Sequence, residues 1–272
     1  VLFHNPGKTS NNLDPMSELI ESRQAVQTSP GIYVLQGELL DTIRNLDALF
    51  KNYALGRGAI EQQYPNTVPT RSLMKNGYIP SFPQHPLFVA SVHGDLASIQ
   101  SLSSKAKEKT YENISWIGEH LDEHSQILSP TVCYHCFEFL KGRSVPSPGT
   151  EFTAVASCNR YEGRNVQGLS RLQTFTMREI IFFGSADGVS KARNEIMEHC
   201  KSQFVQWDVR FRIVTASDPF FAGSLDSKRV YQSVMALKYE VQMYLPHADS
   251  WLSVASLNNH QQSLVKAYEI GF

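Results

Sequence analysis

Hydrophobic and polar positions recur along this chain with two different periods. Apolar residues between Ile43 and Phe50 return at helical spacing, so the pattern predicts an amphipathic helix over about 38–53. A second helix is predicted over about 189–201, and residues 96–125 have the pattern of a polar helical region. Strand-type patterns are seen in six segments: 59–64, 152–162, 169–183, 207–214, 239–245 and 251–257. Together they predict an α+β fold, in which helices flank an antiparallel sheet.

Composition narrows the class of protein. Of the 272 residues, 42% are hydrophobic and 19% are charged, and 25 basic residues against 26 acidic ones give a net charge of -1. This charge lacks the basic excess that is typical of a nucleic-acid binder. No apolar run approaches the roughly 18 residues needed to span a membrane, and no signal peptide is visible. Because the four cysteines do not form a disulfide pattern, we expect a cytoplasmic protein.

Cys133 and Cys136 form a C-x-x-C pair. A zinc knuckle needs a second pair, but Cys158 and Cys200 are far apart in the sequence. A redox pair favours a helix N-terminus in a βαβ unit, which the pattern here does not predict. From the pair alone, buried structural cysteines are the default interpretation.

The predicted hairpin over 152–183 carries the most informative side chains. Alternation places Arg160 and Glu162 on one face of the first strand, and Arg171, Phe175 and Glu179 on one face of the second. Two arginines beside an aromatic ring fit a ligand that is both planar and polyanionic, such as ATP. A solvated hairpin whose charges pair with each other is the structural alternative.

The residues of this hairpin also carry a family resemblance. Arg160-Tyr-Glu162, a loop, and then Gly168-Leu-Ser-Arg171 through Phe175 to Glu179 resemble motif 2 of class II aminoacyl-tRNA synthetases, in its seryl form. Specifically, the chain resembles the amino acid:[carrier protein] ligases, which are relatives of the zinc-dependent seryl-tRNA synthetases. Residues 61–65 and then 72–83 resemble motif 1 and the loop that follows it, which builds the dimer interface of this class. The resemblance implies a polar lead-in over 1–30 and a class II catalytic domain over 31–272.

The family resemblance implies a two-step reaction. The enzyme first joins an amino acid to ATP as an aminoacyl-adenylate, and then transfers the aminoacyl group to the phosphopantetheine thiol of a carrier protein. The resemblance assigns Arg160 to the α-phosphate, Glu162 and Phe175 to adenine, and Arg171 to the other phosphates. Glu240 is the candidate Mg²⁺ ligand, with Gln242 as the alternative at that position, and Asp218 and Asn258 lie in segments expected at the substrate.

The resemblance also implies a zinc ion that binds the substrate amino group. Cys133 and Glu179 match two of its three ligands. The third ligand, a cysteine, and motif 3 are expected after residues 256–270, but neither occurs before Phe272. We expect them beyond this residue; an incomplete site is the alternative.

The implied partners are a carrier protein, a small amino acid and a second copy of the chain in a homodimer. No tRNA-binding arm precedes the catalytic segment, so we expect no tRNA partner. Seryl-tRNA synthetase activity and a catalytically inactive paralogue with a binding role stay open as alternatives. Lys105, Lys107 and Lys109, beside the helical stretch 114–121, are a candidate patch for an acidic carrier helix, and an ordinary solvated helix is the alternative.

Overall fold

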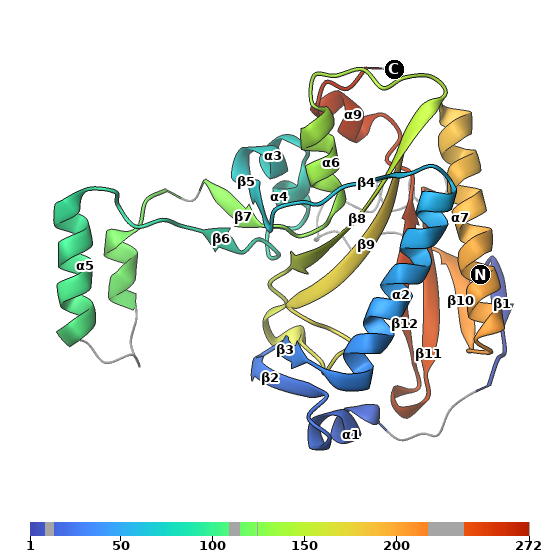
Figure 1. Ribbon diagram of the computed structural model, residues 1–272, viewed down its shortest axis with the longest axis horizontal. Coiled ribbons are helices and arrows are strands. Elements are labelled where there is room, and N and C mark those ends of the chain that lie inside the picture. Colours follow the sequence, from blue (N-terminus) through green and yellow to red (C-terminus); the bar gives the residue numbers. More distant parts are fainter. Residues whose placement is uncertain (9–13, 109–114, 124, 217–236, 272) are drawn as a thin grey trace.

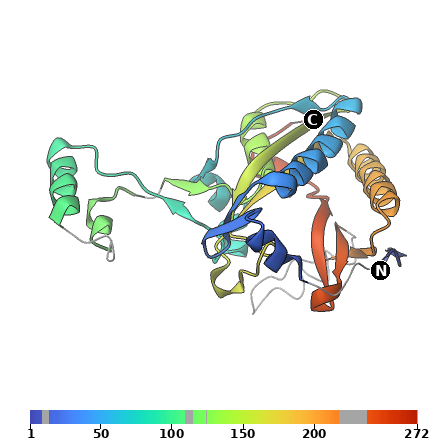
Figure 2. The same ribbon diagram turned by 60° about the horizontal axis from the view of Figure 1, so that its bottom comes forward.

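The computed structural model describes residues 1–8, 14–108, 115–123, 125–216 and 237–271. Two sheets dominate the body, and two long helices lie against them (Figures 1 and 2). Among the described residues, no helix combines the length and the apolar character needed to cross a bilayer.

A long antiparallel hairpin forms the centre of the first sheet. Strands β8 (Gly149–Asn159) and β9 (Thr174–Gly184) pair along their whole length, and the short strand β4 (Ile60–Glu61) runs parallel to β8. Phe152, Ile181 and other buried side chains of this hairpin pack with helix α6 (Cys133–Leu140). The hydrophobic core therefore fixes the hairpin near Gly149 and Gly184, which leaves the end joined by the loop 160–173 to carry polar residues.

Helices α2 (Gly37–Gly56) and α7 (Ala186–Gln206) cover one side of the strands (Figures 1 and 2). The Ser185 side chain accepts the N–H of Gly188 at 3.1 Å and so caps the start of α7. Asp47 of α2 accepts hydrogen bonds from Arg178 of β9. Arg178 therefore faces α2, and its neighbours in β9 face the opposite side.

The second sheet has the strand order β1-β10-β11-β12, all antiparallel. Its strands have these bounds: β1 (Phe3–Asn5), β10 (Phe211–Thr215), β11 (Lys238–Leu245) and β12 (Ser250–Asn258). Phe211, Ile213, Val241 and Leu257 form a buried cluster with Phe204 of α7. This cluster joins the second sheet to the same helix that covers the first one.

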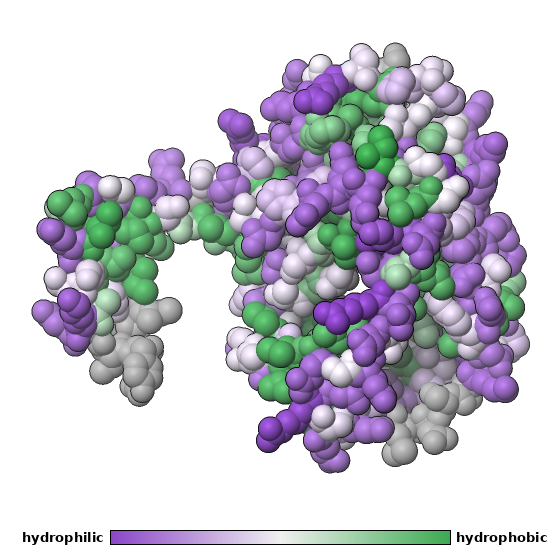
Figure 3. All heavy atoms as spheres, in the orientation of Figure 1, coloured by the Kyte–Doolittle hydropathy of each residue, from purple (hydrophilic) through white to green (hydrophobic). Residues whose placement is uncertain are grey.

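A slender arm leaves the body through a third small sheet, with the order β5-β7-β6 (Figures 1 and 2). The arm holds helix α5 (Leu96–Glu108) and the 3-10 helix η1 (Ser115–His120), and the small sheet consists of β5 (Thr67–Pro69), β6 (Phe88–Val89) and β7 (Gln126–Leu128). Apolar residues gather on its surface in Figure 3, and Leu96 and Ile99 of α5 are 68% and 47% exposed.

The other elements are short and connect the sheets. They are α1 (Pro15–Glu21), β2 (Ala25–Ser29), β3 (Ile32–Leu35), α3 (Thr70–Lys75), α4 (Tyr78–Ser81), η2 (Gly163–Asn165), η3 (Pro246–Ala248) and α9 (Ser263–Ala267). The α+β prediction is confirmed, with largely antiparallel strands that have α2 on one face of the hairpin and α6 on the other. The strand predicted over 59–64 is correct only at Ile60–Glu61, and the strand predicted from 207 begins at Phe211 because the chain turns at Asp208, whose φ is 54°.

Candidate active site

The β8–β9 hairpin gathers four of the predicted site residues at its loop end. Arg160 follows β8, and its backbone N–H donates to the Gln173 carbonyl at 2.9 Å, which extends the pairing beyond the strands. The Arg160 guanidinium carbon lies 5.2 Å from the centre of the Phe175 ring. Glu162 accepts a hydrogen bond from Nε of Arg171 at 2.8 Å. The structure therefore joins Arg160 to Phe175 and Glu162 to Arg171 within one hairpin.

The face of β9 that points away from α2 carries the candidate chemistry. Cys158 lies opposite Phe175 in the register, and both pack with Val132 and Met177 in a small buried cluster. Glu179 lies opposite Ala154, a member of the same cluster, so it shares this face. The alternation that places Phe175 and Glu179 together in the sequence is confirmed.

Arg160 is anchored at one end and open at the other. Its Nε donates to the carbonyl of Pro130 at 2.9 Å, and the neighbouring Ser129 carbonyl accepts the N–H of Asn159 at 2.8 Å. Within the described part of the chain, Arg160 forms no ion pair. A guanidinium carries five N–H donors in a planar fork, so its terminal nitrogens can receive a phosphate.

The Glu162–Arg171 pair is placed to exchange partners. The Arg171 side chain is 56% exposed, whereas that of Glu162 is 11% exposed. An ion pair with one exposed member contributes only about 0–1 kcal/mol. A polyanion that enters the site can therefore draw Arg171 away at little cost.

Cys133 and Glu179 lie in contact next to this hairpin. Oε1 of Glu179 accepts hydrogen bonds from Oγ1 of Thr131 at 2.5 Å and from the N–H of Val132 at 3.1 Å. Burial raises the pKa of Glu179, although these hydrogen bonds oppose the rise. Burial and the nearby Glu179 carboxylate raise the pKa of the Cys133 thiol well above its usual range. A bound cation would favour the charged forms of both groups.

The donor set fits a metal ion in part. Cys133 and Glu179 supply one sulfur and one carboxylate, which are common zinc donors. Within the described residues, no group of three or more His, Cys, Asp or Glu side chains is placed to hold a metal. Cys136 is fully buried, and burial raises the pKa of its thiol to about 12, so it has the surroundings of a structural cysteine. All four cysteines are free.

Glu240 and Asn258 lie on neighbouring strands of the second sheet. Glu240 pairs in register with Ser256, and Asn258 with Lys238, so the two residues share a face. Oε1 of Glu240 lies 3.2 Å from Nζ of Lys238, and Oε2 of Glu240 accepts a hydrogen bond from Gln242 at 3.0 Å. No hydrogen bond or ion pair joins this group to the hairpin within the described ranges. Asp218 lies outside the described residues.

The sequence interpretation missed three polar residues that line or support the site. Thr131 holds Glu179, and its place two residues before Cys133 was a usable signal. Tyr78 and His85 come from the segment after motif 1, and His85 accepts the backbone N–H of Tyr161 through its carbonyl at 2.9 Å. Nothing in their spacing indicates that they meet the hairpin, because the contact is made by a distant loop.

Known proteins give the context of this arrangement. No protein-family model matches the chain. The chain is 28% identical over 263 residues to the amino acid--[acyl-carrier-protein] ligase 1 of Bradyrhizobium diazoefficiens, a match that covers 96% of this chain and 78% of the relative.

Solved structures agree with this relationship. A seryl-tRNA synthetase of M. kandleri in complex with an A. aeolicus tRNASec superposes with a TM-score of 0.84, at 19% identity, over 99% of this chain and 54% of that one. The synthetase of Pyrococcus horikoshii complexed with ATP gives a TM-score of 0.68 at 14% identity, over 94% of this chain and 51% of that one. The chain thus spans about half the length of these structures. It has the fold of the seryl-tRNA synthetases, and in sequence it is similar to the amino acid--[acyl-carrier-protein] ligases, as its motifs predict.

Proposed function

We propose that the protein is a ligase that activates an amino acid with ATP and transfers it to the phosphopantetheine thiol of a carrier protein. The observation that carries the proposal is the loop end of the β8–β9 hairpin, where Arg160 lies over Phe175 and Arg171 pairs with Glu162. Similarity to the amino acid--[acyl-carrier-protein] ligase supports the acceptor, and the P. horikoshii neighbour, which is complexed with ATP, supports the nucleotide.

In the first step, the amino-acid carboxylate attacks the α-phosphorus of ATP, and the bond to the β-phosphate breaks to release pyrophosphate. Adenine would lie on Phe175 and meet the carboxylate of Glu162. Arg160 would hold the α-phosphate, since its Nε is fixed by Pro130 and no described residue forms a hydrogen bond with its terminal nitrogens. Arg171 would leave Glu162 for the outer phosphates. No protein nucleophile is needed, because the step rests on position and charge.

The second sheet would supply a ligand to the Mg²⁺ ion of the nucleotide and a contact to the amino acid. Glu240 is the proposed Mg²⁺ ligand, and Gln242 is the alternative. A hydrogen bond from Gln242 to Glu240 keeps these two side chains next to each other. The ion pair with Lys238 holds the Glu240 carboxylate on the face of the sheet, and a divalent cation would replace Lys238 as its partner. Asn258, on the adjacent strand, and Asp218 are the proposed contacts of the amino acid.

Zinc is the proposed second metal. Cys133 and Glu179 would hold it, and the third ligand is the cysteine that the resemblance implies. When bound, zinc would take the unprotonated amino group of the substrate and so orient its carboxylate. Thr131 and the N–H of Val132 keep Oε1 of Glu179 in place and leave Oε2 for the metal.

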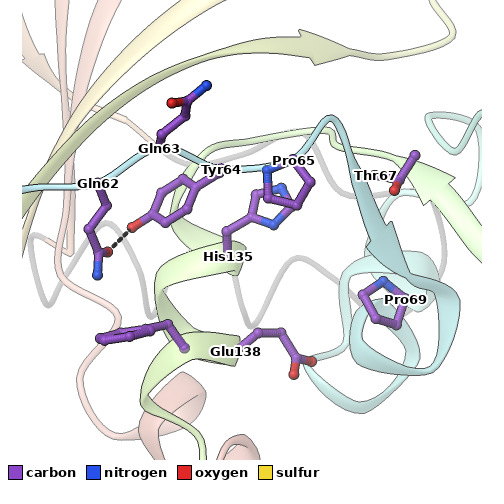
Figure 4. A pocket seen from close by; sticks show the side chains of 9 residues that line it. Gln62, Gln63, Tyr64, Pro65, Thr67, Pro69, His135 and Glu138 are labelled. Atoms are coloured by element: carbon purple, nitrogen blue, oxygen red, sulfur yellow. Dashed lines mark hydrogen bonds between the residues drawn. The ribbon is translucent and has the colours of Figure 1, made fainter.

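A homodimer is proposed because residues 61–65 resemble the interface motif of the class. An open depression of about 560 Å³ lies there, and Figure 4 shows Tyr64 and Pro65 above His135 and Glu138 of α6. Phe139, which lines the same depression, is 45% exposed. An exposed aromatic residue beside a hollow is suited to cover by a second copy.

The carrier would dock at the arm, and Lys105 and Lys107 of α5 are the described part of the candidate basic patch. Nζ of Lys105 lies 3.3 Å from Oε2 of Glu119, so Lys105 can bind a carrier only after this exposed ion pair separates. Lys109 lies outside the described residues. A cytoplasmic location is also proposed.

The test separates the acceptors. The protein is incubated with ATP, single labelled amino acids, total tRNA and a panel of carrier proteins that bear phosphopantetheine. Label on a carrier supports the proposal. Label on tRNA alone supports seryl-tRNA synthetase activity, for which the M. kandleri neighbour is the structural argument. The absence of adenylate would support an inactive paralogue.

A further inference from the structure

The loop between α4 and β6 brings an unassigned imidazole to the proposed nucleotide site. The His85 ring lies parallel to Phe82, with the ring centres 5.2 Å apart and an angle of 5° between the planes. Its carbonyl accepts the N–H of Tyr161, which lies between Arg160 and Glu162 in the hairpin. The backbone contact therefore holds this histidine against the segment that carries the proposed phosphate and adenine contacts, and the stack with Phe82 fixes its ring.

The loop is built to keep His85 in one place. Its N–H donates to the carbonyl of Phe82 at 3.1 Å, and the N–H of Phe82 donates to the carbonyl of Tyr78 at 2.8 Å. Pro83 and Pro86 flank the turn, and each proline ring fixes its own φ. A ring that is stacked and held by a rigid turn loses little further freedom when a ligand binds.

The hydrogen bonds of His85 determine which ring nitrogen carries the proton. The Tyr78 hydroxyl lies 3.1 Å from Nδ1 of His85, and Tyr78 is only 6% exposed. Burial raises the pKa of Tyr78, so its hydroxyl keeps the proton and needs an acceptor. Within the described residues, Nδ1 of His85 is the acceptor that it has. In the neutral ring the proton then lies on Nε2.

The charges around His85 favour the neutral ring. Burial and the guanidinium of Arg160 lower the pKa of His85, Arg171 lowers it further, and Glu162 opposes them. Nε2 of His85 forms no hydrogen bond within the described part of the chain. The site thus holds a neutral N–H donor that no described residue accepts, near the proposed phosphate-binding arginine.

We propose that His85 is a nucleotide-binding residue whose Nε2–H donates a hydrogen bond to a phosphate oxygen next to Arg160. This inference rests on the proposed function, because it takes the nucleotide as the ligand of the hairpin. It adds a neutral donor, fixed by Tyr78 and Phe82, to the charged donors of the hairpin. A neutral donor at this place avoids a third positive charge beside Arg160 and Arg171 when the site is empty.

Two substitutions at one position test the donor. His85→Phe keeps a ring against Phe82 and removes the donor, whereas His85→Gln places an amide N–H₂ close to the position of Nε2. Binding of ATP, AMP and adenosine to the full chain is measured by calorimetry. We expect His85→Phe to lower the affinity for ATP and for AMP by about tenfold or more, because a hydrogen bond to a charged group is lost. His85→Gln should recover most of this affinity, and adenosine should bind equally to all three proteins.

Tyr78→Phe is the control for a structural role. It removes the hydroxyl partner of Nδ1 and leaves Nε2 in place, so we expect a smaller loss of ATP affinity than in His85→Phe. Equal affinity of wild type and His85→Phe for ATP would overturn the inference alone. Equal losses in all variants, with lowered melting temperatures, would assign His85 a structural role and also overturn it. A wild-type protein that binds no nucleotide would overturn the proposed function as well.

Discussion

Arg160→Ala separates the proposed role of this arginine in the reaction from its role in stability. In the structure, Arg160 makes one hydrogen bond to the carbonyl of the buried Pro130 and one contact with the face of Phe175. Loss of the hydrogen bond costs about 1 kcal/mol, and loss of the cation–π contact costs about 0.5–1 kcal/mol. The free energy of unfolding should therefore fall by about 1–2 kcal/mol.

The loss of activity should be much larger than the loss of stability. Removal of one donor that stabilises charge in a closed site lowers the rate by about 10²–10³, which corresponds to about 3–4 kcal/mol. The assay is amino-acid-dependent exchange between ATP and pyrophosphate, with chemical denaturation measured in parallel. Arg160→Lys keeps the charge but loses the planar fork, so its exchange rate should lie between wild type and Arg160→Ala.

Arg44→Ala is the matched control, because Arg44 is an exposed arginine of α2 whose side chain is 70% exposed. It should leave both exchange and stability unchanged. Exchange by Arg160→Ala within a few-fold of wild type would refute the assignment of the α-phosphate to this residue. A loss of exchange that only follows unfolding would refute it as well, since the residue would then be structural.

Three further predictions concern the metal, the assembly and the core. Protein purified without added metal should hold one zinc per chain by elemental analysis, and Cys133→Ser should lower this content; full activity without metal would contradict the zinc proposal. Light scattering at micromolar concentration should show a homodimer, and a clean monomer would count against the interface. Arg57→Ala should lower the free energy of unfolding by about 3 kcal/mol, because it leaves the buried carboxylate of Glu151 without its ion-pair partner. Denaturation in urea measures this, and a loss below about 1 kcal/mol would disprove it.

Long elements with one buried face were predictable from the sequence. Helix α2 extends over Gly37–Gly56, around the predicted 38–53, and β9 keeps Phe175 and Glu179 on one face. These elements pack along their whole length, so the pattern of each strand or helix reports its burial directly. The three-residue strand β1 is too short to show such a pattern, and its partner β10 lies about 200 residues away.

The arm shows the limit of local patterns in another way. A polar helical region over 96–125 was predicted, and α5 and η1 lie there. Nothing in the spacing indicates that this region stands off the body, since helix periodicity describes the element and not its partner (Figure 1). Ile99 belongs to the pattern that predicts the helix, yet its side chain is exposed and joins no core of the described residues.

The site was predictable where one hairpin carries it and not where loops complete it. Alternation placed Phe175 on the site face of β9, and Arg160, which the predicted first strand included, directly follows β8 and contacts Phe175. The backbone carbonyl of Pro130 that fixes Arg160 has no side-chain signature, and His85 reaches the hairpin through a turn held by main-chain hydrogen bonds. Contacts of this kind depend on the path of the chain between elements, which residue types do not encode.

The most direct test of the central claim is the mass of the carrier protein after reaction. A holo-carrier is incubated with the protein, ATP and one amino acid at a time, and its intact mass is measured before and after treatment with hydroxylamine. The account predicts a gain of one aminoacyl group on the phosphopantetheine thiol, which hydroxylamine removes, and no gain with Arg160→Ala. Adenylate formation with every carrier unchanged, while tRNA becomes aminoacylated in the same mixture, would contradict the account.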